Sequence, residues 1–167
     1  MDTQNLSTLF KTTLLASAMA MVVGCSDNKV PGTDTQSNTG SAFDWYISGA
    51  TVFPDFDKNG SQKPDSNETT YATTTDDTGS YTLTIPVNLG TNYDVVITGG
   101  KDIATGDKFT GILKAGPTDK QATSATTLKQ AFLKANSTLS EADAIKKVNA
   151  FLGLPAGTDF SNDSPET

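Results

Sequence analysis

From residue 43 to residue 114, apolar side chains recur at every second position in short segments, and glycine, asparagine or aspartate ends most of these segments. A period of two is the period of a β-strand that buries one face. The clearest case is the segment 80–86, in which Tyr81, Leu83 and Ile85 alternate with polar residues. Five to seven such segments, spaced by about ten residues, predict an antiparallel β-sandwich.

The predicted strands cover residues 43–53 (one strand, or two broken at Gly49), 69–75, 80–86, 93–98 and 109–114. After Thr118 the apolar period changes to that of a helix. Ser140 precedes the second apolar stripe as a helix cap would, and Gly153 with Pro155 ends it. The two stripes consist of Leu128, Ala131, Phe132 and Ala135, and of Ile145, Val148 and Leu152. We therefore expect a mainly β fold, an antiparallel Ig-like or prealbumin-like sandwich followed by a C-terminal α-helical hairpin.

The N-terminal region carries an apolar run, residues 12–23, that is too short to span a bilayer, which takes about 20 residues. It has the length of the apolar region of a signal peptide. The residues that follow, Val22-Val23-Gly24-Cys25, resemble the lipobox of bacterial lipoproteins. The resemblance implies cleavage before Cys25, a diacylglyceryl group on its thiol and an N-acyl lipid on the new amino terminus. Because Ser26 stands where an inner-membrane retention signal has aspartate, we expect a lipid-anchored protein of the bacterial outer membrane or cell surface.

The sequence divides into four parts on this interpretation. Residues 1–24 are the signal peptide, and residues 25–42 are the lipidated cysteine with a flexible tether, because this stretch has hardly any apolar side chains to bury. Residues 43–118 form the β-sandwich domain, and residues 119–167 form the helical hairpin and a polar tail. The membrane is the expected partner, through the lipid anchor.

The composition excludes several classes of function. Cys25 is the only cysteine, so the exported part forms no internal disulfide. The chain has no histidine, and on this interpretation its only thiol carries lipid. The usual catalytic pairs of a nucleophile with a base are therefore missing, and we expect that the protein is not an enzyme. A net charge of −7 argues against nucleic acid as a partner.

One loop has the residues of a metal site. Asp55, Asp57 and Asn59 stand at the first, third and fifth positions of a segment that opens like an EF-hand loop, and Gly60 follows at the sixth. A two-residue insertion after Gly60 would give the remaining ligand roles to Asp65 and Glu68. The pattern predicts that calcium is bound by Asp55, Asp57, Asn59, Asp65 and Glu68. The alternative is a solvated acidic hairpin loop without metal.

Two segments resemble a known family. Residues 49–53, which read GATVF, and residues 76–86, which read DDTGSYTLTIP, resemble the B-repeat and carboxypeptidase-regulatory-like β-sandwiches of bacterial surface proteins. Loops of that family open with several aspartates and close with a glutamate, which implies the same calcium ligands. The later part of the chain, through the helix pair, is similar to a segment that follows such domains in bacterial lipoproteins and adhesins.

The expected function is therefore that of a surface-anchored lipoprotein with a calcium-stabilised structural or adhesion module. The alternative is a binding module of an envelope complex, with a carbohydrate or a surface protein as partner. Trp45 and Tyr46 are the candidate contacts for such a ligand, since adjacent aromatic side chains on a strand or loop can stack on a sugar or a protein surface.

Overall fold

The computed structural model describes residues 34–163, so the predicted signal peptide and Cys25 lie outside the described residues. The described chain is mainly β, with antiparallel sheets and two C-terminal helices. The strands are β1 (Thr35–Ala42), β2 (Ile47–Ser48), β3 (Thr51–Asp55), β4 (Thr73–Thr74), β5 (Ser80–Pro86), β6 (Asp94–Thr98), β7 (Lys101–Asp102), β8 (Ile112–Ala115) and β9 (Gln121–Ala122); the helices are α1 (Ser124–Ala135) and α2 (Glu141–Leu152).

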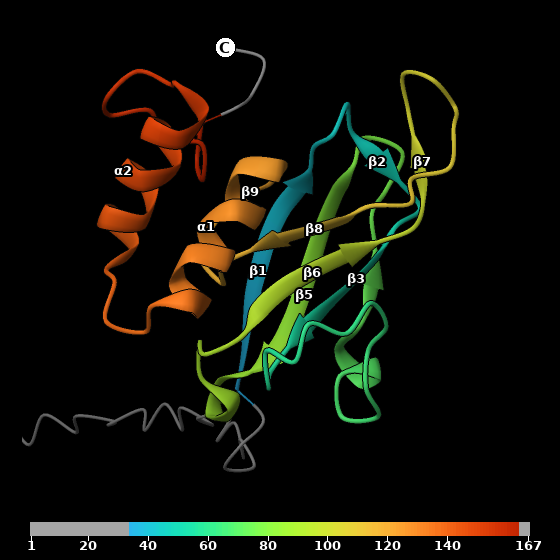
Figure 1. Cartoon of the computed structure of the whole chain (residues 1–167). Helices are drawn as coiled ribbons and strands as arrows, with labels where there is room; N and C mark the ends of the chain where they lie inside the picture. Colours follow the sequence, from blue (N-terminus) through green and yellow to red (C-terminus); the bar gives the residue numbers. More distant parts are fainter. Residues whose placement is uncertain (1–33, 164–167) are drawn as a thin grey trace, which may run out of the picture.

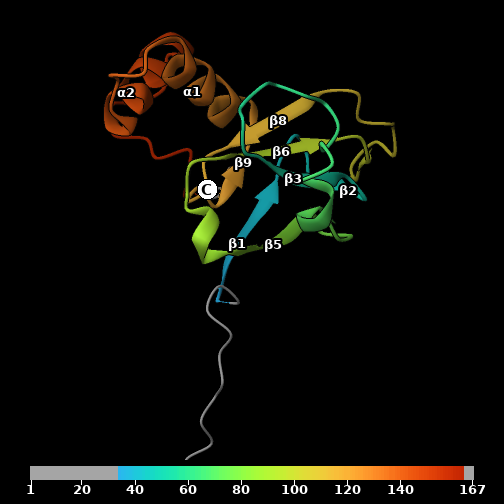
Figure 2. The same cartoon turned by 90° about the horizontal axis from the view of Figure 1, so that it is seen from below.

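The two larger sheets lie in two layers (Figures 1 and 2). One has the strand order β4-β3-β6-β8 and the other β5-β1-β9, while β2 and β7 form a separate pair. One apolar cluster draws on both layers: Tyr81, Leu83 and Ile85 come from β5, and Val52, Val95, Ile97, Leu113 and Ala115 come from the four-stranded sheet. Tyr81, Leu83 and Ile85 thus face the core together, as the alternation in 80–86 predicted.

The helical hairpin lies beside the sheets, with α1 next to β8 (Figure 1). The backbone N–H of Lys114 in β8 donates to Thr127 Oγ1 in α1 at 2.8 Å. The predicted ends of α2 are confirmed, since Ser140 Oγ accepts from the Asp143 N–H and Gly153 adopts a left-handed φ of 70°. A glycine takes that conformation without the clash that a side chain would cause.

The predicted tether is wrong from residue 35 onward. Thr35–Ala42 is β1, which pairs antiparallel with β5 from Thr35↔Pro86 to Ser41↔Ser80 and parallel with β9 at its end. A polar strand is stable in this position because β5 pairs with its backbone from Thr35 to Ser41 and β9 pairs with its last two residues. Gly40, one of its inner positions, has to be small, because a Cβ there would lie 2.6 Å from Tyr81 Oη. The sheet therefore extends on both sides of the predicted 43–118 domain.

Two predicted strands are shorter than expected. Residues 43–46 form a turn rather than the start of a strand, because Trp45 and Tyr46 have φ values of 70° and 56°. Residues 69–71 form a 3-10 helix, and only Thr73–Thr74 pair with β3. Short strands at a sheet edge leave room for the long loop that follows β3.

The helices bury only part of the predicted apolar stripes; of the second stripe Val148 is buried as predicted. In α1 the buried residues are Thr126, Lys129 and Gln130, whereas Ala131 and Ala135 of the predicted stripe are exposed. In α2 the buried residues are Ala144, Val148 and Asn149, and Leu152 is 45% exposed. The predicted polar tail also packs on the fold, since the carbonyl of the buried Ser161 accepts from the N–H groups of Lys120 and Gln121. Polar contacts, rather than apolar stripes, hold much of this region in place.

Candidate metal centre

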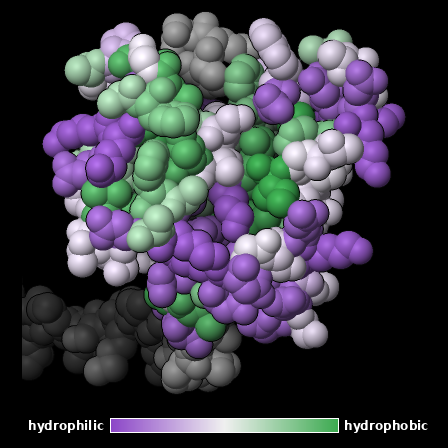
Figure 3. Space-filling view, viewed as in Figure 1, coloured by the Kyte–Doolittle hydropathy of each residue, from purple (hydrophilic) through white to green (hydrophobic). Residues whose placement is uncertain are grey.

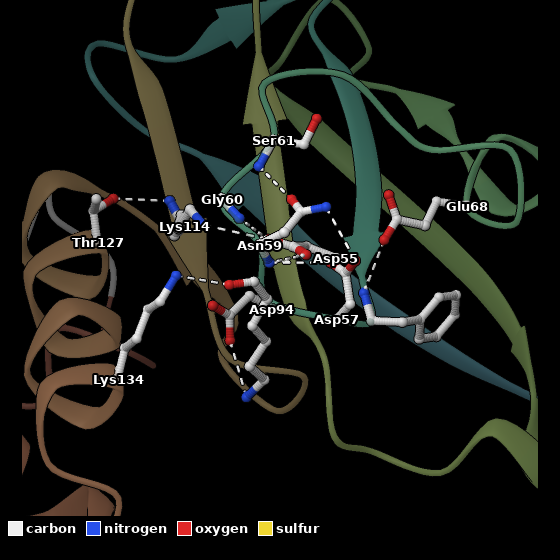
Figure 4. A network of polar contacts seen from close by, with 12 residues as sticks. Asp55, Asp57, Asn59, Gly60, Ser61, Glu68, Asp94, Lys114, Thr127 and Lys134 are labelled. Carbon is white, nitrogen blue, oxygen red and sulfur yellow. Dashed lines mark hydrogen bonds and ion pairs between the residues drawn. The ribbon is translucent and has the colours of Figure 1, made fainter.

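The acidic loop begins where β3 ends. Asp55, the last residue of β3, stands opposite Asp94 of β6, and both are buried. The loop that follows lies over this end of the four-stranded sheet and reaches α1 (Figure 4). Two carboxylates opposite each other repel unless cations or hydrogen bonds compensate them.

The first part of the loop folds back around Asp55, whose side chain is buried. Asp55 Oδ1 accepts from the Asn59 N–H at 3.2 Å, and Oδ2 accepts from the Gly60 N–H at 3.2 Å. Asp57 Oδ1 also accepts from the Asn59 N–H, at 3.0 Å. Gly60 has a φ of 85°, which fits the sharp turn predicted at this glycine. The first, third and fifth residues of the loop therefore converge.

The second part of the loop returns to the same point. Asn59 Nδ2 donates to Asp57 Oδ2 at 3.1 Å and to Asp65 Oδ2 at 2.9 Å. Glu68 is 1% exposed; its Oε1 accepts from the Phe56 N–H at 3.0 Å and its Oε2 from the Asp65 N–H at 2.9 Å. All five residues predicted as ligands thus belong to one connected cluster.

Three carboxylates of this cluster are close enough to share an ion. Asp55, Asp57 and Glu68 each offer one oxygen, and these oxygens lie within 4.8 Å of one another. Carboxylate and amide oxygens are the ligands that calcium prefers, in flexible sets of six to eight. The donor set therefore fits a hard divalent cation, and the Asp57–Asn59–Asp65 contacts would have to open to turn their oxygens toward it.

Three lysines surround the cluster, and the local loop motif did not assign Lys114 or Lys134 to it. Lys114 Nζ lies 3.4 Å from Asp55 Oδ2, and Lys58 Nζ lies 3.2 Å from Asp94 Oδ1. Lys134 Nζ, in α1, donates to the Lys58 carbonyl at 2.7 Å. Only Lys114 pairs with one of the three clustered carboxylates among these contacts, so the cluster keeps an excess of negative charge. Lys114 and Lys134 lie 59 and 76 residues from their partners, beyond the reach of a local motif.

The second pair of candidate residues lies elsewhere on the surface. Trp45 is 68% exposed, and Tyr46 packs edge-on against Phe43 at 4.8 Å between ring centroids. Neither residue is buried in the core: Tyr46 is only partly buried, because both residues belong to the turn before β2. A groove of about 720 Å³ borders Trp45, and Leu152, Leu154 and Phe160 are among its lining residues. Apolar side chains gather over the helical side of the molecule (Figure 3).

Among residues 34–163, no helix is long and apolar enough to cross a membrane. No protein-family model, curated protein or solved structure matches the chain.

Proposed function

We propose that this chain is a surface-anchored lipoprotein whose β domain is a calcium-stabilised structural or adhesion module. One observation carries the proposal: residues from both ends of a fourteen-residue loop meet in one cluster. These residues are Asp55, Asp57, Asn59, Asp65 and Glu68. A loop with this density of acid is destabilised by its own repulsion, and a divalent cation offsets it.

The finer fold belongs to the same proposal. Two facing layers around one core support an Ig-like or prealbumin-like sandwich, with the helical hairpin appended. The loop between β3 and β4 contacts β6 and α1, so an ion there would fix the position of three elements. Such a module suits a stalk or a contact domain that must stay rigid outside the cell.

The calcium test is thermal unfolding of residues 26–167 in excess EDTA and in millimolar calcium. Extracellular calcium modules have dissociation constants of about 10⁻⁴ to 10⁻³ M. Free calcium at about 1 mM is one to ten times that constant, so it adds about 0.4 to 1.4 kcal/mol to the free energy of unfolding. We expect a higher melting temperature in calcium, and a smaller effect of magnesium, which demands a stricter octahedral shell.

A matched pair of variants separates the loop from general charge effects. The double variant Asp57→Ala, Asn59→Ala removes two candidate ligands and is expected to lose the calcium response. Asp107→Ala removes an exposed acid of another loop and is expected to keep it. Equal melting temperatures in calcium and EDTA for the unmodified protein would leave the solvated acidic loop as the correct interpretation.

The anchor is tested on the full chain in a bacterial host. Mass spectrometry of the membrane fraction is expected to show a mature chain that begins at an acylated Cys25. Cys25→Ser is expected to leave the membranes after a carbonate wash. An uncleaved N-terminus, or a Cys25→Ser chain that stays with the membranes, contradicts the lipid anchor.

The exposure of Trp45 favours a second candidate, a carbohydrate- or protein-binding module of an envelope complex. An exposed indole beside a groove presents the kind of flat apolar face that stacks on sugars and protein side chains. A glycan array probed with the protein and with Trp45→Ala tests this candidate. Binding that Trp45→Ala abolishes and Val87→Ala, another exposed apolar position, preserves would favour it over a purely structural module.

A further inference from the structure

The strand β5 forms one edge of the three-stranded sheet, on the outer side of β1 (Figure 2). Its seven residues, Ser80–Pro86, carry no charge. Natural proteins commonly blunt such edges with charged side chains or β-bulges, because an open edge pairs with other strands. The register of β5 with β1 runs without interruption from Thr35↔Pro86 to Ser41↔Ser80, so this ladder holds no bulge. Two of the usual protections of an edge are therefore missing here.

The alternation of hydrogen bonds shows which residues of β5 face this edge. The Ala42 N–H donates to the Gly79 carbonyl at 2.8 Å, and the Val87 N–H donates to the Asp34 carbonyl at 2.7 Å. Bonded and non-bonded pairs alternate along an antiparallel ladder. The backbone groups of residues 81, 83 and 85 therefore face β1, and those of residues 80, 82, 84 and 86 point away from it.

The open part of the edge is its middle. The Ser80 carbonyl accepts from the Asp76 N–H at 2.8 Å, and the Ser80 N–H donates to Asp76 Oδ1 at 2.9 Å. Pro86 has no N–H to offer. Thr82 and Thr84 are exposed, and among residues 34–163 no hydrogen bond reaches their outward N–H and C=O groups. The strand β4 and the 3-10 helix before it come near β5, but neither bonds to these groups.

The open groups match a second copy of themselves. If two β5 strands run antiparallel about a two-fold axis at Leu83, Thr82 of one copy stands opposite Thr84 of the other. Each N–H then meets the C=O of its opposite residue, which pairs all the open groups of both copies. In the same register Ser80 stands opposite Pro86 of the second copy. The residue whose groups are already bonded thus meets the residue without an N–H, and neither end of the contact needs a further bond.

Charge also permits a second copy at this edge. The chain has a net charge of −7, so two copies repel each other unless they meet through an uncharged surface. The exposed side chains at the edge are those of Thr82 and Thr84, and Thr82 Oγ1 lies 3.2 Å from Thr39 Oγ1 of β1. Threonine pairs across strands stabilise a sheet. An uncharged edge of threonines therefore suits contact between two acidic chains.

We propose that two copies of this chain associate through β5, with Thr82 of each copy paired to Thr84 of the other. The two three-stranded sheets then join into one sheet with the strand order β9-β1-β5-β5-β1-β9. A contact between two strand edges is small beside the roughly 1,200 to 2,000 Å² of a standard interface. The association is therefore weak and depends on concentration.

Sedimentation equilibrium of the full chain tests the proposal, with Cys25→Ser as the background so that no lipid drives association. We expect the average mass to rise from that of a monomer toward that of a dimer between micromolar and millimolar concentration. A chain that stays monomeric throughout overturns the proposal, and this is the result expected if the edge accepts only a strand of another protein.

Two variants at one position separate the edge from other contacts. Thr82→Pro removes an outward N–H, takes no hydrogen bond from β1 and is tolerated at such a position of an edge strand. The two-fold axis doubles the loss to two hydrogen bonds, so we expect association to weaken by about tenfold or more, with an unchanged circular dichroism spectrum. Thr82→Val keeps the N–H and the shape, and should still associate. Association that Thr82→Pro leaves unchanged overturns the assignment to β5.

Amide hydrogen exchange tests the contact without a variant. The Leu83 N–H faces β1 opposite Asn38 and should be protected at every concentration. The Thr82 and Thr84 N–H groups should exchange rapidly in dilute solution and more slowly in concentrated solution. Exchange of these two groups at the same rate in both solutions, while the average mass rises, would place the contact elsewhere and overturn the proposal.

Cross-linking tests the register. A mixture of Thr82→Cys chains and Thr84→Cys chains, both with Cys25→Ser, should oxidise to mixed dimers. Opposite residues of a bonded pair have Cα atoms about 5.5 Å apart, which a disulfide spans. Either variant alone places its two cysteines diagonally, at about 7 to 8 Å, and should cross-link much less. Equal cross-linking in the single-variant samples and in the mixture would overturn the register.

Discussion

Replacing Tyr81 with phenylalanine should stabilise the protein, although Tyr81 is one of its most buried residues. The side chain is 3% exposed, and its hydroxyl has no hydrogen-bond partner among the described residues. The hydroxyl lies directly over Gly40, where even a Cβ would approach it to 2.6 Å. A buried polar group without a partner costs about 1 to 3 kcal/mol, and phenylalanine keeps the ring while removing that group.

We therefore expect Tyr81→Phe to raise the free energy of unfolding by about 1 to 3 kcal/mol, measured by urea unfolding at neutral pH. Each kcal/mol corresponds to roughly 2 to 8 °C in melting temperature for domains of this size range. Tyr93→Phe is the matched control, because Tyr93 is equally buried but its hydroxyl is not among the buried polar groups that lack a partner. That variant should lose about 0.5 to 1.5 kcal/mol. A destabilised Tyr81→Phe would show that the hydroxyl is satisfied, by a buried water for example.

The Tyr81 hydroxyl should also make the free energy of unfolding depend on pH in the alkaline range. Burial first, and the charge of Asp119 second, raise the pKa of Tyr81 above its ordinary value. Because the folded chain holds this proton more tightly than the unfolded chain, the contribution to stability is complete below about pH 10, the unfolded pKa. It is lost as pH rises from there toward the folded pKa. Stability of the unmodified protein should therefore fall more steeply above pH 10 than that of Tyr81→Phe.

Four further substitutions test the local structure. Ser140→Ala removes the cap of α2 and should cost about 1 kcal/mol at neutral pH by urea unfolding. The cost should shrink in acid, because the Ser140 hydroxyl is the main cause of the lowered pKa of Asp143, and that contribution disappears as pH falls through this pKa. Gly100→Ala should lower the melting temperature more than Gly106→Ala: both have positive φ, but only at Gly100 would the Cβ meet the Ser48 carbonyl, at 2.6 Å. Phe53→Ala should cost about 3 to 5 kcal/mol, as for other fully buried phenylalanines.

The sequence predicted those elements in which local pattern and tertiary environment agree. β5 alternates because one of its faces meets the core, and α2 begins and ends at the residues with cap chemistry. β1 was missed because its side chains show no apolar strand pattern. The strand is held by backbone pairing with β5 and β9, and that pairing depends on residues about 40 to 80 positions away. Lys129 interrupts the expected apolar face of α1 because its partner, Asp119, is buried with it.

In the candidate site too, the local contacts could be predicted from the sequence and the long-range contacts could not. The spacing of Asp55, Asp57, Asn59 and Gly60 was sufficient to place these residues around one turn, because the motif is local. The contacts of Lys114 and Lys134 arise from β8 and α1, and a lysine in a sequence carries no mark of the carboxylate or carbonyl it meets. Even so, Lys114 is the one charged residue in the short segment Ile112–Ala115, which is a signal that a charged partner lies near that strand.

The position of β1 has a mechanical consequence. A force that enters the described chain at Thr35 acts along β1, which lies between β5 and β9 and points away from that end (Figure 1). Its seven register pairs with β5 would be loaded together in shear, whereas a strand pulled from a hairpin end opens one pair at a time. A pull on residue 35 must therefore break most of the ladder at once before β1 slides out. This arrangement suits a domain held against flow from its N-terminal side, and single-molecule stretching between residues 35 and 163 would measure the resistance.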